Sequence, residues 1–120
     1  MEGYKDADLH RFWTESESQI FVAEDGEVVG FLSVEVHNEP ERYIYLDDFS
    51  VTETYRNKGI GSELIHTAES CAREKGIPAV LLHVEKTNHS ALRLYDRCGF
   101  SIYRDDGHRY LMKHVLRGKN

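Results

Sequence analysis

The stretch Arg56-Asn57-Lys58-Gly59-Ile60-Gly61 stands between an apolar, strand-like run from Tyr43 to Val51 and a helical pattern that extends to about Lys75. The first amides of a helix have no partner within the helix and carry a partial positive charge, so they can bind phosphate. Glycine at positions 59 and 61 removes the Cβ atoms that would keep a diphosphate away from these amides. The stretch therefore predicts a site for a phosphate-bearing cofactor.

Two common phosphate-binding loops do not fit this stretch. A Walker loop ends in Gly-Lys-Ser/Thr, whereas this chain has Gly61-Ser62-Glu63. A dinucleotide fingerprint needs a third small residue, and Leu64 occupies that position. The fingerprint also needs an acid about twenty residues further on, where the chain has Pro78, Ala79 and Val80. What remains is the pattern Arg-x-x-Gly-x-Gly between a strand and a helix.

This pattern resembles the acetyl-CoA diphosphate loop of the GNAT superfamily of N-acetyltransferases. The run from Tyr45 to Leu64 is most similar to the diamine (spermidine/spermine) acetyltransferase branch, which commonly has Glu where Asp47 stands. Further along, Asn88 to Tyr95 followed by Cys98-Gly99-Phe100 resembles the second GNAT signature. The resemblance covers roughly residues 19 to 115 and implies acetyl-CoA as the cosubstrate.

The hydrophobic periodicity and turn signals predict an α/β fold with a mixed sheet, and the resemblance implies a single GNAT-like domain over residues 1–120. Leu9, Phe12 and Trp13 have helical spacing and predict a short helix. The predicted order then continues with strands 19–24, 27–36 and 43–52, helix 59–75, strand 79–85, a helix after residue 88, and a hairpin of 100–104 and 108–115. The GNAT family usually begins with another strand and helix, so both are expected to be missing. That absence would leave a sheet edge for a second subunit to cover, which predicts a homodimer.

Composition narrows the possible partners. A net charge of −6 and a pI near 5.6 argue against binding nucleic acid and favour a cationic substrate. The charged start of the chain is not a signal peptide, and no run is long enough to span a membrane, so we expect a cytoplasmic protein without a membrane partner. The seven histidines and two cysteines show no metal-ligand spacing, so no metal is expected.

Two adjacent acids, Asp47 and Asp48, interrupt the apolar strand directly before the glycine loop. An alkyl ammonium has a pKa of about 10.4, so a carboxylate must help to remove its proton before it attacks a thioester. We interpret Asp47 as the catalytic carboxylate on the acceptor side, with Asp48 assisting it or serving the structure. A β-bulge at this pair would expose amides near Phe49 and Val51 to the cofactor. The alternative is a solvated strand face, or two acids paired with a nearby arginine.

The resemblance implies that Tyr95 is the general acid toward the CoA sulfur. A phenol with a pKa of about 10 can give its proton to a stronger base as that base forms. The alternative is a core tyrosine whose hydroxyl reaches the surface. The second helix is expected to be capped by Asn88 or Ser90. Asn88 has two compatible interpretations, as this N-cap and as a ligand of the pantetheine or phosphate arm of CoA.

Four other side chains have weaker signals. Arg56 is expected to place a positive charge at the phosphate site, with a solvated arginine as the alternative, and Lys58 is solvated or a weak phosphate contact. His83 is a structural histidine or a base, and we favour the first. Cys98 is a poor nucleophile because the end of a helix does not lower a thiol pKa. The residues predicted to contact the cofactor are Phe49, Val51, Arg56, Asn57, Lys58, Gly59, Ile60, Gly61, Ser62, Asn88 and Tyr95.

The function that the resemblance implies is transfer of acetyl from acetyl-CoA to the primary amine of a small cationic acceptor, which is polyamine-, aminoglycoside- or lysine-like. The amine can attack the thioester directly in a ternary complex, without a covalent enzyme intermediate. The alternative is a CoA-binding sensor or partner subunit without turnover. Release of free thiol in the presence of amines distinguishes the two.

Overall fold

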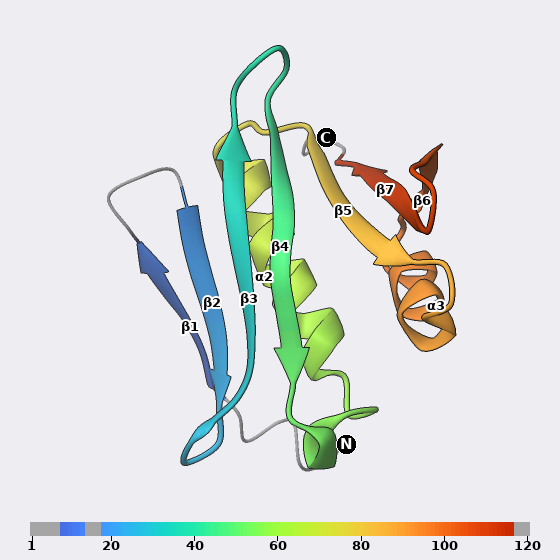
Figure 1. Cartoon of the computed structure of the whole chain (residues 1–120). Helices are drawn as coiled ribbons and strands as arrows, with labels where there is room; N and C mark the ends of the chain where they lie inside the picture. Colours follow the sequence, from blue (N-terminus) through green and yellow to red (C-terminus); the bar gives the residue numbers. More distant parts are fainter. Residues whose placement is uncertain (1–7, 14–17, 117–120) are drawn as a thin grey trace.

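A computed structural model describes residues 8–13 and 18–116 as one seven-stranded sheet with the order β1-β2-β3-β4-β5-β7-β6 (Figure 1). All neighbouring strands are antiparallel except β4 and β5, which are parallel. The strands are β1 (Asp8–Trp13), β2 (Ser18–Glu24), β3 (Val28–His37), β4 (Tyr43–Val51), β5 (Ala79–Glu85), β6 (Ser101–Asp105) and β7 (Arg109–Val115). The helices are η1 (Glu53–Tyr55), α2 (Ile60–Glu74) and α3 (His89–Arg97). The predicted mixed α/β fold is confirmed.

The unit β4–α2–β5 is the predicted parallel crossover. Gly59 precedes α2 in the left-handed conformation at φ 87°, which favours glycine, and Gly76 follows its end at φ 72°. The apolar stripe of α2 packs on β2, β3 and β4, and each large side chain buried there contributes roughly 1.5–3 kcal/mol. The buried apolar residues of α2 are Ile60, Leu64, Ile65, Ala68, Cys71 and Ala72.

The prediction of a helix at Leu9, Phe12 and Trp13 is wrong. Residues Asp8–Trp13 form β1, which pairs with β2 from Asp8 opposite Glu24 to Trp13 opposite Gln19. Three apolar residues in so short a segment do not fix a period, and pairing with the edge of a sheet outweighs a weak helical preference. Because β1 covers the edge of β2, the argument for a dimer from an uncovered edge there no longer holds.

Strands β4 and β5 pair only briefly and then diverge. Ile44, Tyr45 and Leu46 lie opposite residues 80–82, and beyond that point Figure 1 shows the two strands separating toward their carboxyl ends. The peptide groups on that edge of β4 then no longer bond to β5. The residues at the end of β4, Phe49, Ser50 and Val51, line a cavity instead.

A bulge in β4 begins where the strands separate. Leu46 lies opposite Val34 and Phe49 opposite Leu32, so Asp47 and Asp48 face the single residue Ser33 of β3. The backbone N–H of Asp48 donates to Ser33 Oγ at 3.1 Å. The extra residue reverses the alternation of β4, so that Phe49 and not Asp48 faces the helices.

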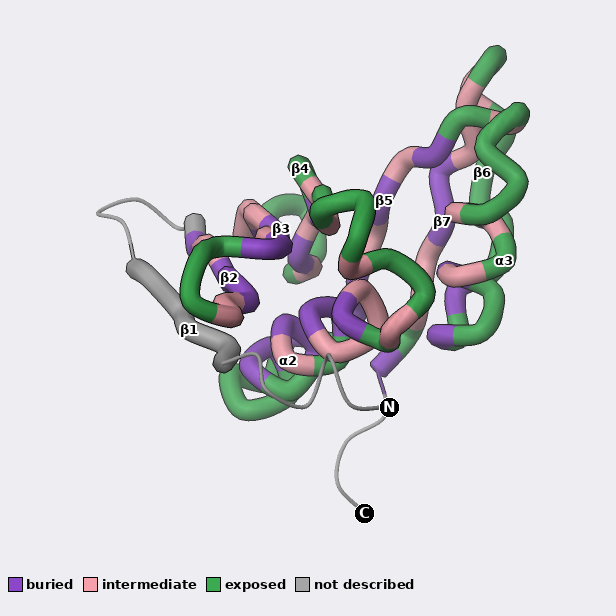
Figure 2. The backbone as a smooth tube through the Cα atoms, turned by 90° about the horizontal axis from the view of Figure 1, so that it is seen from below, coloured by how far each residue is buried: buried purple, intermediate pink, exposed green. Residues whose placement is uncertain are grey.

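Both long helices pack on the same face of the sheet. Figure 2 shows α2 lying along this face. Glu69 of α2 and Nδ1 of His114 in β7 are 2.7 Å apart, and the Tyr95 ring of α3 contacts Phe100, which in turn contacts His114. Within residues 8–13 and 18–116, no helix covers the opposite face. The two faces of the sheet therefore offer different surfaces beside the bulge.

Candidate active site

The N-terminus of α2 is open toward a ligand. Within the described part of the chain, no side chain caps it, so the amides of its first turn point outward without a capping oxygen. Gly61 lines the cavity at this terminus and has a role beyond the one predicted, because a Cβ there would lie 3.0 Å from Cζ of Phe49. The missing Cβ at position 61 makes room for that ring. The positive φ of Gly59 shapes the loop itself.

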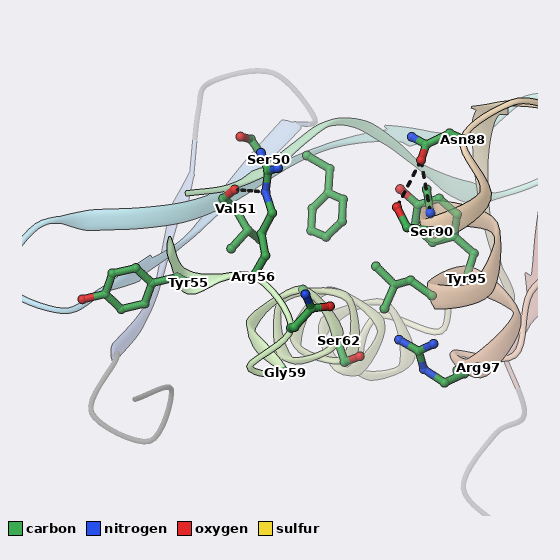
Figure 3. A pocket seen from close by; sticks show the side chains of 15 residues that line it. Ser50, Val51, Tyr55, Arg56, Gly59, Ser62, Asn88, Ser90, Tyr95 and Arg97 are labelled. Carbon is green, nitrogen blue, oxygen red and sulfur yellow. Dashed lines mark hydrogen bonds between the residues drawn. The ribbon is translucent and has the colours of Figure 1, made fainter. Parts of the chain in front are cut away.

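A cavity of about 430 Å³ lies at this terminus, between the end of β4, the loop before α2 and the helix α3 (Figure 3). Two of the predicted cofactor residues are absent from its lining, since Ile60 is buried in the core and Lys58 lies outside it. Tyr55, Ser90 and Arg97 also line it and were not predicted. The predicted residues that line it are Phe49, Val51, Arg56, Asn57, Gly59, Gly61, Ser62, Asn88 and Tyr95.

The loop before α2 is held by two side-chain bonds. Nε of Arg56 donates to the carbonyl oxygen of Val51 at 2.9 Å, as Figure 3 shows. The hydroxyl of Tyr55 donates to Asp25 Oδ2 at 2.6 Å and so connects the loop to the β2–β3 turn. Arg56 and Arg97 thus bring two positive charges to the cavity, which suits a diphosphate.

Asn88 is the N-cap of α3, as predicted. Its Oδ1 accepts from the backbone N–H of Ala91 at 3.2 Å and from the Ser90 hydroxyl at 3.4 Å. Both bonds use the oxygen of the amide, so the two N–H donors of the same side chain are left for a ligand. The two interpretations of Asn88 are therefore compatible in this geometry.

Tyr95 lies at the inner end of the cavity and is 9% exposed. Its ring centroid is 6.4 Å from that of Phe49 and 5.9 Å from that of Phe100. Burial, with a smaller contribution from Cys98, raises the pKa of Tyr95 to about 12. The phenol is therefore protonated at neutral pH and can donate a hydrogen bond into the cavity.

Asp47 and Asp48 are exposed and do not line this cavity. Burial, followed by the charges of Asp48 and Glu35, raises the pKa of the Asp47 carboxyl. The alternative of a pairing with a nearby arginine finds no support, because no ion pair of either acid exists among the described residues. Asp47 is instead one of several acids near a second group of polar side chains.

That second group is a hydrogen-bonded chain on the sheet face opposite the helices. The hydroxyl of Tyr45 is 2.6 Å from Nδ1 of His83, and Nε2 of His83 is 2.8 Å from Oδ2 of Asp106. Arg104 donates to both oxygens of Asp106, and these bonds together with the one to His83 lower the pKa of Asp106. An ionised Asp106 accepts from Nε2–H, so Nδ1 is the nitrogen that accepts from Tyr45.

Tyr45 is the outer end of this chain. Burial raises the pKa of Tyr45, the Arg109 cation opposes that shift, and Asp47 and Glu35 add to it. A structural role was expected for His83, and that histidine has partners on both nitrogens. Such a chain can accept a proton at Tyr45 while Tyr45 passes its own to His83, where Asp106 stabilises the imidazolium.

A second cavity, of about 500 Å³, lies beside this chain on the same face. Tyr43 and Tyr45 of β4 line it, together with Leu81 and His83 of β5. On β4, residues 43 and 45 therefore line one cavity and residues 49–51 line the other. The bulge at residues 47 and 48 lies between them, where β4 and β5 separate.

Other sites considered from the sequence have little support. Cys98 is buried, with its Sγ 3.9 Å from the Ser62 hydroxyl, and burial raises the pKa of the thiol. A nucleophile needs the thiolate, which this environment disfavours.

Among the residues that the structure describes, no group of three or more His, Cys, Asp or Glu side chains is arranged to hold a metal ion. In the same part of the chain, none of the helices combines the length and the apolar character that a membrane span requires.

The sequence profile of the acetyltransferase (GNAT) family matches residues 2–100, so the chain belongs to this family. It is 36% identical over 88 residues to the mycothiol acetyltransferase of Thermomonospora curvata, which covers 72% of this chain and 29% of that protein. It is 34% identical over 90 residues to the streptothricin acetyltransferase of Streptomyces lavendulae, which covers 73% of this chain and 47% of that protein.

The fold is similar to the crystal structure of the PaiA N-acetyltransferase of Thermoplasma acidophilum in complex with coenzyme A. The TM-score is 0.78 at 24% identity, over 83% of this chain and 62% of that chain. The present chain spans less than half the length of the two relatives named above. The resemblance to the GNAT superfamily is confirmed, whereas the narrower resemblance to its diamine acetyltransferase branch stays a prediction.

Proposed function

We propose that this protein transfers the acetyl group of acetyl-CoA to the primary amine of a small acceptor by direct attack. The observation that carries the proposal is the placement of two cavities on opposite faces of β4, with the bulge at Asp47 and Asp48 between them. One cavity has a helix N-terminus for a diphosphate, and the other has a proton-accepting chain. The thioester would lie where the two meet.

On the cofactor side, the amides that begin α2 and the charges of Arg56 and Arg97 would hold the diphosphate. The pantetheine arm would run between the end of β4 and α3, where it could replace the β5 partner that this part of β4 lacks. The N–H donors of Asn88 would bond to the same arm. A backbone amide at the bulge would polarise the thioester carbonyl.

On the acceptor side, Asp47 and Glu35 would attract the ammonium group, and the Tyr45 oxygen would accept its proton. Tyr45 would pass its own proton to Nδ1 of His83, and Asp106 would hold the resulting imidazolium. The neutral amine would then form the N–C bond as the C–S bond breaks, and the second proton that leaves the nitrogen would pass to water. The imidazolium would return its proton to water, since the His83 side chain is 17% exposed.

Tyr95 would stabilise the departing sulfur. Complete transfer of a proton from a phenol of pKa about 12 to a free thiolate of pKa about 8.5 is uphill by roughly 5 kcal/mol. Tyr95 would therefore act as a hydrogen-bond donor to the developing thiolate more than as a full proton donor. The thiolate would take its proton after leaving the site.

The acidic groups around Tyr45 support a cationic amine as the acceptor, and the polyamine-, aminoglycoside- and lysine-like classes all stay open at this level.

A cytoplasmic location and a homodimer stay predictions. For the dimer, sedimentation at micromolar concentration is the direct test, and a strictly monomeric species would contradict it.

The test of the proposed function combines the protein with acetyl-CoA and a panel of primary amines and measures free thiol with a chromogenic disulfide. We expect thiol release that depends on both the amine and the protein. Calorimetric binding of CoA without thiol release for any amine or peptide would favour the alternative, a sensor or partner subunit. An acetyl group trapped on Cys98 would contradict direct attack.

A further inference from the structure

The cavity on the acceptor face carries positive charge at a distance from Tyr45. Lys113 of β7 and Arg42, just before β4, both line it. The Lys113 ammonium lies 4.6 Å from the centroid of the Tyr103 ring. Arg42 donates to Asn38 Oδ1 at 2.9 Å and to the Lys75 carbonyl oxygen at 3.1 Å, which are both neutral. Among the described residues, neither cation forms an ion pair with a carboxylate.

Charges of both signs act at Tyr45, the other end of the same cavity. Tyr45 lines the cavity, and the Arg109 cation, then Asp47 and Glu35, act on its hydroxyl from outside the lining. Glu41 also lines the cavity, at the exposed turn beside Arg42. The two cations without a carboxylate partner, Lys113 and Arg42, lie at the far end, away from the hydroxyl at which the amine would react.

The wall between the two ends is apolar and aromatic. Tyr43, Leu81 and Leu111 line it from three neighbouring strands. A chain of methylene groups or a ring packed against this wall would be shielded from water on one side. Each CH₂ that is buried in this way would contribute about 0.8 kcal/mol to the free energy of binding. A second ammonium at the far end would instead face Lys113 and Arg42 and be repelled.

We propose that the acceptor is an amino acid whose reactive amine and carboxylate are separated by an apolar chain, such as an ω-amino acid or a lysine that reacts through its side chain. This inference rests on the proposed function. The amine would bind at Tyr45 and Asp47, and the carboxylate would bind at Lys113 and Arg42. A polyamine fits the first end of the cavity but not the second.

The register of the strands gives the approximate separation of the charges. Tyr45 lies opposite Leu81 in the β4–β5 pair, and Leu81 lies opposite Lys113 in the β5–β7 pair, so Tyr45 and Lys113 are in one row, two strands apart. Two strand spacings amount to roughly 10 Å. An α-amino acid reacting through its α-amine cannot bridge that distance, because its amine and carboxylate are attached to the same carbon. An acceptor with several intervening methylenes can.

The test uses three acceptors of equal chain length that differ only at the far end. They are 6-aminohexanoate, hexylamine and 1,6-diaminohexane, each followed by thiol release with acetyl-CoA under the same conditions. A charge-assisted hydrogen bond contributes about 1.5–3 kcal/mol, so we expect kcat/KM for the carboxylate to exceed that for hexylamine by about tenfold or more. The diamine should be the poorest of the three.

A charge variant sharpens the test. Lys113→Met should lower kcat/KM for 6-aminohexanoate by about tenfold, chiefly through KM, and leave hexylamine within about twofold. Arg93→Met is the matched control, because Arg93 is exposed on α3, lines neither cavity and loses the same unit of charge. The comparison of acceptors on the unaltered protein requires no variant to fold.

Two results would overturn the inference in distinguishable ways. If the diamine or hexylamine is the best acceptor, or if Lys113→Met lowers all three equally, the carboxylate site is wrong while the proposed acetyl transfer stands. If CoA binds and no amine in a broad panel releases thiol, the proposed function fails and the inference fails with it.

Discussion

The cavity beside α2 takes its residues from two stretches, 49–62 and 88–97, whereas the cavity on the opposite face takes them from four segments between residues 40 and 115. The first includes a glycine at positive φ and an uncapped helix end. The second is made largely of side chains from four adjacent strands, β4, β5, β7 and β6. The cavity proposed for the cofactor is thus encoded locally, whereas the cavity proposed for the acceptor is encoded by the fold.

The largest effect should come from breaking the proton-accepting chain. His83→Gln removes the base that receives the Tyr45 proton, and general-base catalysis contributes about 10²–10⁴-fold. We expect thiol release with an alkyl amine at pH 7 to fall by about 10²- to 10³-fold. The affinity for CoA, measured by calorimetry, should change by less than about twofold because His83 does not line the cofactor cavity.

The pH profile distinguishes proton removal from a merely structural role. In His83→Gln, the rate of thiol release should rise continuously with pH, because the neutral amine then forms only by deprotonation in solvent. Asp106→Asn should show the same dependence on pH, with a smaller loss of rate relative to the unaltered protein. If His83→Gln releases thiol at pH 7 within about twofold of the rate of the unaltered protein, the hydrogen-bonded chain of Tyr45, His83 and Asp106 takes no part in the mechanism.

On the cofactor side, the largest effect should come from Tyr95→Phe. The loss of one hydrogen bond to a developing negative charge costs about 2.7–4 kcal/mol, or about 10²- to 10³-fold in kcat. Because Tyr95 is buried, the variant keeps its ring contacts with Phe49 and Phe100, and CoA affinity should change little. The matched control is Tyr110→Phe, which removes a hydroxyl outside both cavities. Equal losses in the two variants would argue against a role for Tyr95 at the sulfur.

The predictions from sequence succeeded where a signal is local. The bounds of α2 and β5 follow from helical periodicity, from Gly59 and Gly76, and from a short apolar run. Asn88 was identified as a cap from its position before an amphipathic helix, and the structure shows the bond. Most residues expected to contact the cofactor line the cavity beside α2, because one motif specifies both the loop and the helix end, and their contact with CoA stays a prediction.

The failures have a common physical cause, which is pairing between distant strands. The six residues of β1 are a strand because β2 is beside them, and no pattern within the six residues encodes that partner. In the same way, Tyr45 and His83 are 38 residues apart, and Asp106 is 23 residues further on. Only the β4–β5–β7–β6 arrangement brings them together, so no spacing rule could have joined them.

A backbone change can sharpen the comparison from the cofactor side. Gly59→Ala places a Cβ on a residue at φ 87°, which costs roughly 1–2 kcal/mol of folding stability or distorts the loop. Gly76→Ala imposes the same penalty at the other end of α2, at φ 72° and with open space around the added methyl. We expect both variants to lose similar stability in urea titration, but only Gly59→Ala to bind CoA about tenfold more weakly. Equal CoA affinity in both variants would contradict a backbone cradle at Gly59.

The smallest effect concerns the hydration of the Tyr95 hydroxyl in the cavity beside α2. A phenol with a pKa near 10 when unfolded and about 12 when folded favours the folded state below pH 10, and that stability is lost as pH rises toward 12. Between pH 9 and pH 11 the free energy of unfolding should therefore fall by about 1 kcal/mol more in the unaltered protein than in Tyr95→Phe, measured by urea titration at each pH. The same decrease in both proteins would mean that the Tyr95 hydroxyl is well hydrated, and that its hydrogen bond to sulfur would compete with water.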